Sequence, residues 1–270
     1  MLTKSVNVPA LGALWRTLSG SLALVAGRVS LAELESGIHE KYSDRMELET
    51  ARRQASLGLT ESERDLFRRH LAPAASVLDV GCAGGRVSLA LGQAGFRVVG
   101  VDCNEPMVEQ ATALTEGAQL TVPFQVMDAR SLAFRNESFD AVLLVGSVIG
   151  YIRGCGNRRQ ALREAWRVLR PGGRMLVVTP SRECAWRFTV WSAAMRMAHR
   201  LLGLLGRAAS DWEPGDRFGP AWSGDSERLV YWYMYAPAEL ESDLAAVGFE
   251  IVESYPHSYM MTFVASKPTA

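Results

Sequence analysis

The stretch Val77-Leu-Asp-Val-Gly-Cys-Ala-Gly-Gly-Arg-Val-Ser-Leu-Ala-Leu91 decides the fold class of this chain. It begins with a hydrophobic run that suits a strand buried on both faces of a parallel sheet. Glycines at positions 81, 84 and 85 then permit a tight turn and leave no side chain between the backbone and a ligand. The turn opens a helix, whose free N-terminal amide groups face whatever occupies the turn. The stretch therefore predicts a nucleotide-binding βα unit.

The spacing within this turn argues against a dinucleotide enzyme. A dinucleotide fingerprint reads G-x-G-x-x-G, whereas the order here is Asp79-x-Gly81-x-Ala83-x-Gly85. A carboxylate two residues before the first glycine repels a pyrophosphate but attracts a ligand that carries an ammonium and a sulfonium group. The turn is therefore expected to hold a cationic nucleoside rather than NAD.

Two further acids follow at the ends of predicted strands. Residues 98–102 read as a buried strand that ends in Asp102, about 20 residues beyond the glycine turn, which is the separation that brings neighbouring strand ends together in a βαβ unit. Residues 122–130 read as a third strand that ends near Asp128. The other segments that fit the same pattern are a helix start at Asn104-Glu-Pro-Met107, a strand at 138–147 and a helix end at Leu169-Arg-Pro-Gly-Gly173.

These motifs, in this order over residues 77–180, resemble the class I S-adenosylmethionine-dependent methyltransferases. The resemblance implies an α/β Rossmann-like fold, with a mostly parallel seven-stranded sheet, helices on both faces, an N-terminal helical cover and a lid insertion after strand five. Residues 249–253 and 259–265 are expected to form the antiparallel strands at the sheet edge. The resemblance to this family also implies that the cofactor is S-adenosylmethionine and that no metal is needed.

Residue roles follow from the same resemblance. Asp79 is expected to contact the methionyl ammonium directly or through water, Asp102 the ribose, and Asp128 with Ala129 the adenine. Gly146, at the end of the fourth strand, borders the place where the methyl group meets its acceptor. The complete set of expected cofactor-binding residues is Asp79, Gly81, Cys82, Ala83, Gly85, Asp102, Cys103, Met107, Asp128, Ala129 and Gly146.

Ala83 departs from the family pattern, because many members have a glycine at this position. A methyl group is expected to be tolerated here only if φ is negative, so that Gly84 adopts the turn conformation instead. The departure is expected to lower cofactor affinity without abolishing binding.

A hydroxyl or protonated amine acceptor requires a base, and four side chains are candidates. They are His39 and Tyr42 in the N-terminal cover, Tyr151 after the fourth strand, and His257 between the final strands. His39 is preferred, because histidine titrates near neutral pH and family members fold this segment over the cofactor. A lone histidine in a helix is more often a surface residue, so alignment and exclusion of water are expected to contribute more than a base.

The additions to the core are expected to choose the substrate. The methyltransferase core is expected at 71–180 and 236–270, with the cover at 1–70 and a substrate-recognition insertion at 181–235. Residues 11–28 predict an apolar helix that is packed on the domain or lies at an interface, rather than a signal peptide or a membrane span.

The insertion carries an apolar helical stripe with arginines on another face. This pattern predicts either a lid helix or a basic amphipathic helix that contacts a membrane surface or admits a lipid-like substrate. The apolar stripe is Phe188, Trp191, Met195, Leu202 and Leu205, and the arginines are Arg196, Arg200 and Arg207. A polar loop is expected at 211–217, and after it Tyr231, Tyr233 and Tyr235 share one face of a strand, where they line a pocket or fill a buried edge.

The composition of the chain narrows the class of methyl acceptor. Basic and acidic residues balance at 29 each, so no global basic field collects nucleic acid. Four widely spaced cysteines favour reduced thiols in a cytoplasmic protein over disulfides or zinc. A small-molecule O- or N-methyltransferase is therefore preferred, with a tRNA-modifying methyltransferase as the second interpretation and a cofactor-binding module without turnover as the third. The sequence assigns neither the acceptor nor the oligomeric state.

Overall fold

The computed structural model describes residues 31–118, 120–183, 197, 213–220, 229–257 and 259–269. In chain order the elements are α2 (Leu31–Tyr42), α3 (Arg45–Leu57), α4 (Glu61–His70), β1 (Ser76–Val80), α5 (Arg86–Gln93), β2 (Arg97–Asp102), α6 (Glu105–Gly117), β3 (Phe124–Val126), β4 (Phe139–Val145), α7 (Val148–Tyr151), α8 (Cys155–Val168), β5 (Leu169–Pro180), β6 (Asp216–Pro220), β7 (Leu229–Tyr233), α10 (Pro237–Val247), β8 (Glu250–His257) and β9 (Met260–Ser266).

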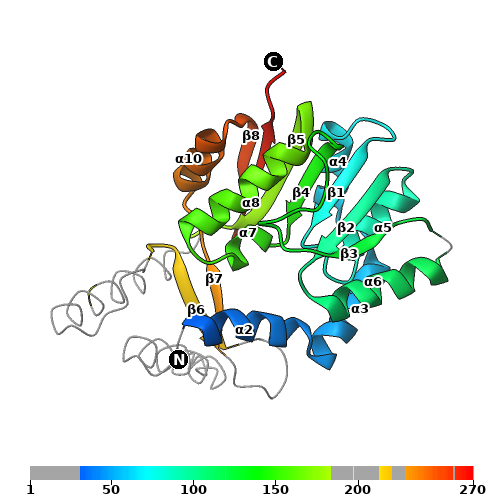
Figure 1. Cartoon of the computed structure of the whole chain (residues 1–270), viewed down its shortest axis with the longest axis horizontal. Helices are drawn as coiled ribbons and strands as arrows, with labels where there is room; N and C mark the ends of the chain where they lie inside the picture. Colours follow the sequence, from blue (N-terminus) through cyan, green and yellow to red (C-terminus); the bar gives the residue numbers. More distant parts are fainter. Residues whose placement is uncertain are drawn as a thin grey trace, which may run out of the picture.

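Seven strands form one sheet in the order β3-β2-β1-β4-β5-β9-β8. The strands β1 to β5 pair in parallel, and β9 pairs antiparallel with both β5 and β8. Figure 1 shows α2 crossing the end of this sheet, beside the separate hairpin of β6 and β7. The predicted seven-stranded, mostly parallel sheet is confirmed.

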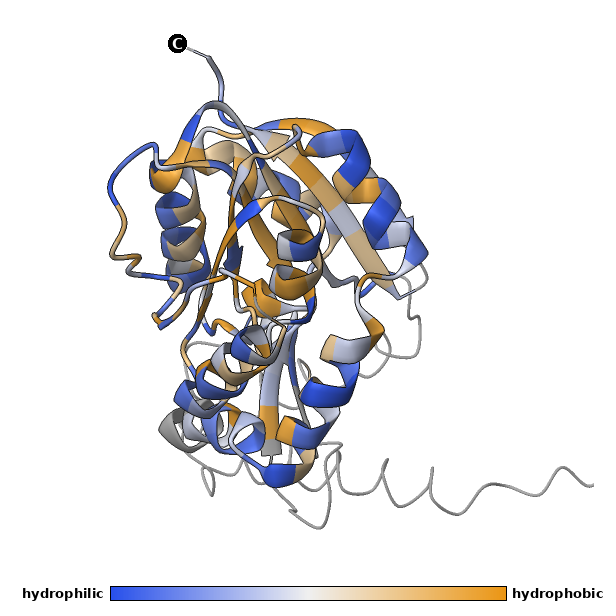
Figure 2. Ribbon diagram, turned by 90° about the vertical axis from the view of Figure 1, so that its right-hand side faces the viewer, coloured by the Kyte–Doolittle hydropathy of each residue, from blue (hydrophilic) through white to orange (hydrophobic). Residues whose placement is uncertain are grey.

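The sheet is buried on both faces, as the hydrophobic runs of its strands indicate. Leu78, Val80 and Val142 belong to a core cluster that includes residues of α8 and α10. Val77 and Leu143, which alternate with them along the strands, belong to a second cluster with residues of α4 and α5. Figure 2 shows hydrophobic colour along the strands and mixed colour on the flanking helices, as expected for a sheet between two helical layers.

Local capping interactions fix the helix ends, among them the start predicted at Asn104. Thr60 and Glu63 form a reciprocal capping box at the start of α4. Asn104 caps α6 by accepting a hydrogen bond from the Met107 amide at 3.2 Å. Gly248 ends α10 in the left-handed conformation.

The glycine turn corrects the expectation for Ala83. Ala83 itself adopts a positive φ of 45°, as do Gly81 at 72° and Gly85 at 82°, whereas Gly84 does not. Gly84 is required for close packing instead, since a Cβ atom there would lie 2.9 Å from the Cβ of Ala51 in α3. The Ala83 amide donates to Asp102 Oδ2 at 2.9 Å, and this bond holds the alanine in a conformation that its methyl group disfavours.

Replacing Ala83 with glycine is therefore expected to stabilise the fold. The left-handed conformation costs a non-glycine residue about 1–2 kcal/mol, and glycine's greater freedom in the unfolded chain offsets part of the gain, which leaves about 0.5–1 kcal/mol. The measurement is the free energy of unfolding in urea. Ala238→Gly, at an exposed position in α10, is the matched control and is expected to destabilise. A loss of stability in Ala83→Gly would contradict the argument.

Two predicted segments differ from the structure. The third strand is short, Phe124–Val126, within the predicted 122–130. The polar loop predicted at 211–217 ends in strand β6, where Asp216 and Arg217 are buried. Burial follows from tertiary pairing, because the hydroxyl of Tyr231 donates to Asp216 Oδ1 at 2.9 Å.

Two other predictions fall outside the described residues. They are the apolar helix at 11–28 and the amphipathic helix that carries the arginines between 188 and 207. Within the ranges that are described, no helix combines the length and the apolar character that a membrane crossing requires.

Candidate active site

A cavity of about 250 Å³ lies at the carboxyl ends of β1, β2 and β4, where α2 covers the sheet. Ligands of open α/β sheets bind at this edge. Most of the residues expected to bind a cofactor line the cavity, and those that do are Gly81, Ala83, Asp102, Cys103, Met107, Asp128, Ala129 and Gly146. The remaining lining residues are Ile38, His39, Tyr42, Val80, Asn104, Met127, Arg130, Val148, Tyr151, Ile152 and Arg153.

Asp102 joins the glycine turn to the end of β2. Its Oδ2 accepts from the Ala83 amide and its Oδ1 from the Asn104 amide, both at 2.9 Å. Burial raises the pKa of this carboxyl, while the two backbone N–H groups oppose that rise. Each carboxylate oxygen has a further lone pair, so Asp102 retains the capacity to accept two hydroxyl groups at the cavity wall.

Asp128 also lines the cavity, but it is already ion-paired. Arg130 donates from Nε to Oδ1 at 3.0 Å and from Nη2 to Oδ2 at 2.6 Å. These hydrogen bonds are the main reason that the pKa of Asp128 is lowered. An amino group that approached Asp128 would have to share the carboxylate with Arg130. Sequence reasoning missed Arg130, although its position two residues after the acid was a usable signal.

Asp79 is placed differently from its expected role. Its side chain is 2% exposed, does not line the cavity, and accepts a hydrogen bond from Ser88 Oγ at 2.6 Å. Burial raises its pKa to about 6, against the opposing effects of Ser88 and Arg86. In this structure Asp79 therefore acts on the cavity as a buried charge behind the glycine turn rather than as a lining group.

Cys82 and Gly85 are the other expected cofactor residues that do not line the cavity. Cys82 is buried, and burial raises the pKa of its thiol well above the usual range, which makes it a packing residue rather than a nucleophile. Gly85 supplies a left-handed N-cap for α5, and a Cβ there would contact Ala111 and Phe124 at 3.0 Å. Its role is therefore to shape the turn.

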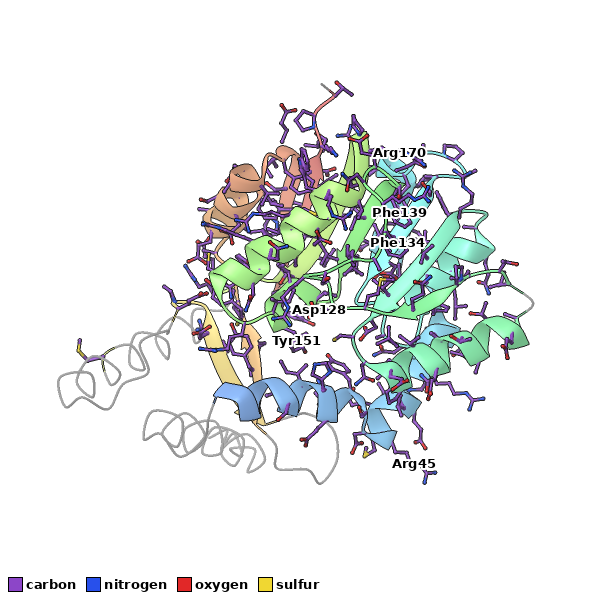
Figure 3. The ribbon with its side chains drawn as sticks, viewed as in Figure 1. Arg45, Asp128, Phe134, Phe139, Tyr151 and Arg170 are labelled. Atoms are coloured by element: carbon purple, nitrogen blue, oxygen red, sulfur yellow. The ribbon has the colours of Figure 1, made fainter. Side chains whose placement is uncertain are left out.

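Three candidate bases meet at the cavity. His39, Tyr42 and Tyr151 all line it, and the two tyrosine rings pack edge to face with centroids 5.7 Å apart. Figure 3 shows Tyr151 and Asp128 in the space between α2 and the sheet. Burial, followed by the effect of Tyr151, raises the pKa of Tyr42, so this hydroxyl is a poor base. The fourth candidate, His257, ends the edge strand β8, and its side chain is outside the description.

Asn104 holds α2 over the cavity. Its Nδ2 donates to the His39 carbonyl and to Ser43 Oγ, both at 3.0 Å, while its Oδ1 caps α6. Sequence reasoning recognised the cap but missed the second function, because the partners lie more than sixty residues away. The cover at this edge is therefore attached to the strand end that carries Asp102.

A buried arginine anchors the hairpin of the insertion to the core. Arg158 in α8 is 1% exposed, donates from Nε to the Tyr235 hydroxyl at 3.0 Å, and forms an ion pair with Glu213. Its guanidinium carbon lies 3.6 Å from the centroid of the Tyr233 ring. Tyr231 is also buried in the core. The three tyrosines of this segment therefore fill a buried edge rather than line the cavity, which is one of the two arrangements predicted for them.

Comparisons with known proteins agree with this geometry. The family described as "Methyltransferase domain" matches residues 77–173. A demethylmenaquinone methyltransferase from Clavibacter sepedonicus is 32% identical over 204 residues, which cover 73% of this chain and 76% of the relative. A ubiquinone biosynthesis O-methyltransferase from Azorhizobium caulinodans is 31% identical over 179 residues, which cover 66% of this chain and 59% of the relative. The chain thus spans about three fifths of the length of relatives of the latter kind.

Solved structures share the fold. An S-adenosylmethionine-dependent methyltransferase from Methanosarcina mazei superposes with a TM-score of 0.63 at 20% identity, covering 79% of this chain and 100% of the other. The 1,6-didemethyltoxoflavin-N1-methyltransferase of Burkholderia thailandensis superposes with a TM-score of 0.58 at 20% identity, covering 88% of each chain. Together with the 32% identical relative, the glycine turn and the strand-end acids, these findings show that the chain belongs to the class I S-adenosylmethionine-dependent methyltransferases.

Proposed function

We propose that this chain transfers the methyl group of S-adenosylmethionine to a small aromatic acceptor, by O- or N-methylation. The observation that carries the proposal is the mixed lining of the cavity. The glycine turn and Asp102 contribute polar groups, and Tyr42, Tyr151 and Ile152 contribute aromatic and apolar side chains. The quinone-related names of two relatives support a ring-shaped acceptor.

The residues present fit the cofactor. A Cβ atom at Gly81 would overlap the side chain of Val148, so the turn leaves room only for bare backbone beside the cavity. We assign Asp102 to the ribose hydroxyls, because its oxygens are fixed by backbone amides and face the cavity. Asp128, Ala129 and Met127 are assigned to the adenine, and Gly81, Ala83 and Gly146 to the methionine portion.

The cofactor supplies a methyl group on a sulfonium that is already an activated leaving group. The residues of this chain then have to align the acceptor and exclude water. Helix α2 covers the cavity and is held there through Asn104, while Tyr42 and Tyr151 line the cavity and pack edge to face against each other. These contacts restrict an aromatic acceptor to an orientation in which its nucleophilic atom meets the methyl group.

Replacing His39 with alanine is expected to lower kcat by less than about fivefold. His39 lines the cavity. A general base is usually oriented by a carboxylate, but among the described residues no carboxylate is hydrogen-bonded to the His39 ring; the contact from Asn104 is to the His39 carbonyl. A general base contributes about 10²–10⁴-fold, so a loss of at least a hundredfold with cofactor affinity retained would assign the proton transfer to His39 and contradict this expectation. Steady-state kinetics at saturating cofactor are the measurement, with Glu40→Ala on the same helix as the control.

Affinity for S-adenosylmethionine is expected to fall as the pH drops through about 6. Burial raises the pKa of Asp79 to about 6, so its negative charge behind the turn is present above that pH and lost below it. A cationic ligand favours the ionised form, and a shift of one pKa unit on binding corresponds to about tenfold in affinity. Calorimetry between pH 5 and 8 is the measurement. The pKa of Asp102 is raised as well, so the pH dependence of the wild-type protein is compared with that of Asp79→Asn, which lacks only the Asp79 carboxyl. An equal pH dependence of affinity in the two proteins would contradict the role given to Asp79.

Transfer from labelled S-adenosylmethionine to a panel of acceptors tests the proposed function. The panel contains catechols and hydroquinones, nitrogen heterocycles, and total tRNA. Label in an aromatic small molecule supports the proposal, and label in tRNA alone would favour the second interpretation of the sequence. Cofactor binding without transfer to any member of the panel would favour a non-catalytic module.

A further inference from the structure

We propose that Arg153 binds an anionic group of the acceptor, so that the substrate class is aromatic compounds that carry a carboxylate or a phosphate. This inference rests on the proposed function and names the substrate class of the same cavity. It is carried by an arginine that lines the cavity and that no carboxylate of the described residues neutralises.

Arg153 belongs to the segment between α7 and α8 and lines the cavity together with Tyr151 and Ile152. The backbone of this segment is fixed from two sides. Asn157 Nδ2 donates to the Arg153 carbonyl at 2.9 Å, and Arg158 Nη1 donates to the Ile152 carbonyl at 3.3 Å. Arg153 therefore belongs to a segment whose backbone is held by hydrogen bonds from α8.

The acids around this segment already have other partners. Glu213 accepts from the Cys155 amide at 2.6 Å and pairs with Arg158. Asp243 pairs with Arg159 at 2.7 Å, and Asp128 pairs with Arg130 at 2.6 Å. Within the part of the chain that the structure describes, no ion pair or side-chain hydrogen bond compensates the charge of Arg153.

Arg153 is half-buried, and a charged group that loses part of its hydration is stabilised when an anion pairs with it. Arginine binds both carboxylate and phosphate through two parallel N–H groups. Because the acids around Arg153 are paired with other groups, the partner we infer for its guanidinium is an oxyanion of a ligand bound in the cavity.

The position of Arg153 favours the acceptor over the ribose and adenine of the cofactor. Asp102 ends β2 and Asp128 follows β3, whereas the segment of Arg153 follows β4 and α7, on the other side of β1 in the strand order. Figure 1 shows α7 and β3 on opposite sides of the space above α2. An aromatic ring against Tyr151 can therefore direct its anionic group to Arg153.

Three ligands that share one ring test this inference. They are 3,4-dihydroxybenzoate, 3,4-dihydroxyphenylphosphonate and the neutral 3,4-dihydroxybenzamide, titrated by calorimetry into protein saturated with S-adenosylhomocysteine. We expect the two acids to bind the wild-type protein about tenfold more tightly than the amide, as a charge-assisted pair provides. Arg153→Gln is expected to reduce this preference below about twofold, and Arg153→Lys to retain part of it.

Arg163→Gln is the matched control, since it makes the same change on the exposed face of α8 and is expected to keep the acid preference. A wild-type protein without acid preference, or an Arg153→Gln protein that retains it, would overturn the inference. A second arm compares S-adenosylhomocysteine with 5′-methylthioadenosine, which lacks the amino acid portion. If Arg153→Gln weakens only the former, Arg153 holds the cofactor carboxylate and the inference is likewise overturned.

The two proposals fail in different ways. If the wild-type protein prefers the acids but transfers label to no aromatic compound, the proposed function fails and the anion site stands. If label reaches aromatic acceptors without regard to their charge, the proposed function stands and the anion site fails.

Discussion

Replacing Asp102 with alanine is expected to weaken binding of S-adenosylhomocysteine by about 2–4 kcal/mol, which corresponds to about 25- to 800-fold in Kd. The loss has two physical causes. A charged acceptor for two ribose hydroxyls disappears, and the amides of Ala83 and Asn104 lose the oxygens that fix the glycine turn. Because Ala83 holds a disfavoured conformation, the turn is expected to relax once this bond is gone.

Calorimetry with S-adenosylhomocysteine measures this loss directly. Asp128→Ala is the matched comparison, and its effect is expected to be smaller because Arg130 already occupies that carboxylate. Circular dichroism confirms that the variants are folded. A loss of less than about threefold in Asp102→Ala would contradict the assignment of Asp102 to the ribose, since even one charge-assisted bond contributes about 1.5–3 kcal/mol.

Replacing Arg158 with methionine is expected to destabilise the fold by about 3–5 kcal/mol, the usual result of removing one partner of a buried ion pair. The substitution removes the donors to Tyr235 and to the Ile152 carbonyl. Among the described residues it leaves the Glu213 carboxylate with only the Cys155 amide as a donor. The contact of the guanidinium with the Tyr233 ring is lost as well.

Urea unfolding measures this effect, and Arg163→Met on the exposed face of α8 serves as the control. The double variant Arg158→Met with Glu213→Gln is expected to recover part of the loss, because the uncompensated carboxylate is removed together with its partner. A change below about 1 kcal/mol in Arg158→Met would show that the pair contributes no more than a surface salt bridge. Equal stability of the single and double variants would place the effect in packing instead.

The anchoring by Arg158 also bears on the insertion at 181–235. Residues 213–220 and 229–235 belong to it by sequence, yet Tyr231 and Tyr235 lie in the main core cluster. An experiment on substrate recognition therefore has to shorten the insertion between residues 184 and 212 and keep the hairpin. Removal of the hairpin would leave the buried charge of Arg158 without its partners, as the substitution Glu213→Ala would leave it without its carboxylate.

The fold class was predictable because its signals are local. The hydrophobic run before the glycine turn, the acids at the ends of two later strands and the cap at Asn104 each depend on residues a few positions apart. Parallel strands separated by helices bring their carboxyl ends to one edge, so the order of the motifs was sufficient to place Gly81, Asp102 and Asp128 around one cavity.

The remaining features depend on contacts between distant residues. An alanine is expected to have a negative φ, but Ala83 has a positive one. The hydrogen bond from the Ala83 amide to Asp102, which is 19 residues away, holds it there. The partners of Arg158 are Glu213 and Tyr235, which are 55 and 77 residues away. The amino-acid sequence by itself determined the sheet, the turn and the edge of the sheet that carries the cavity, since short-range periodicity and capping encode them. Only the tertiary structure decided which carboxylates are buried, paired or open to the cavity, because the environment of a charged group is set by the chain segments that pack around it.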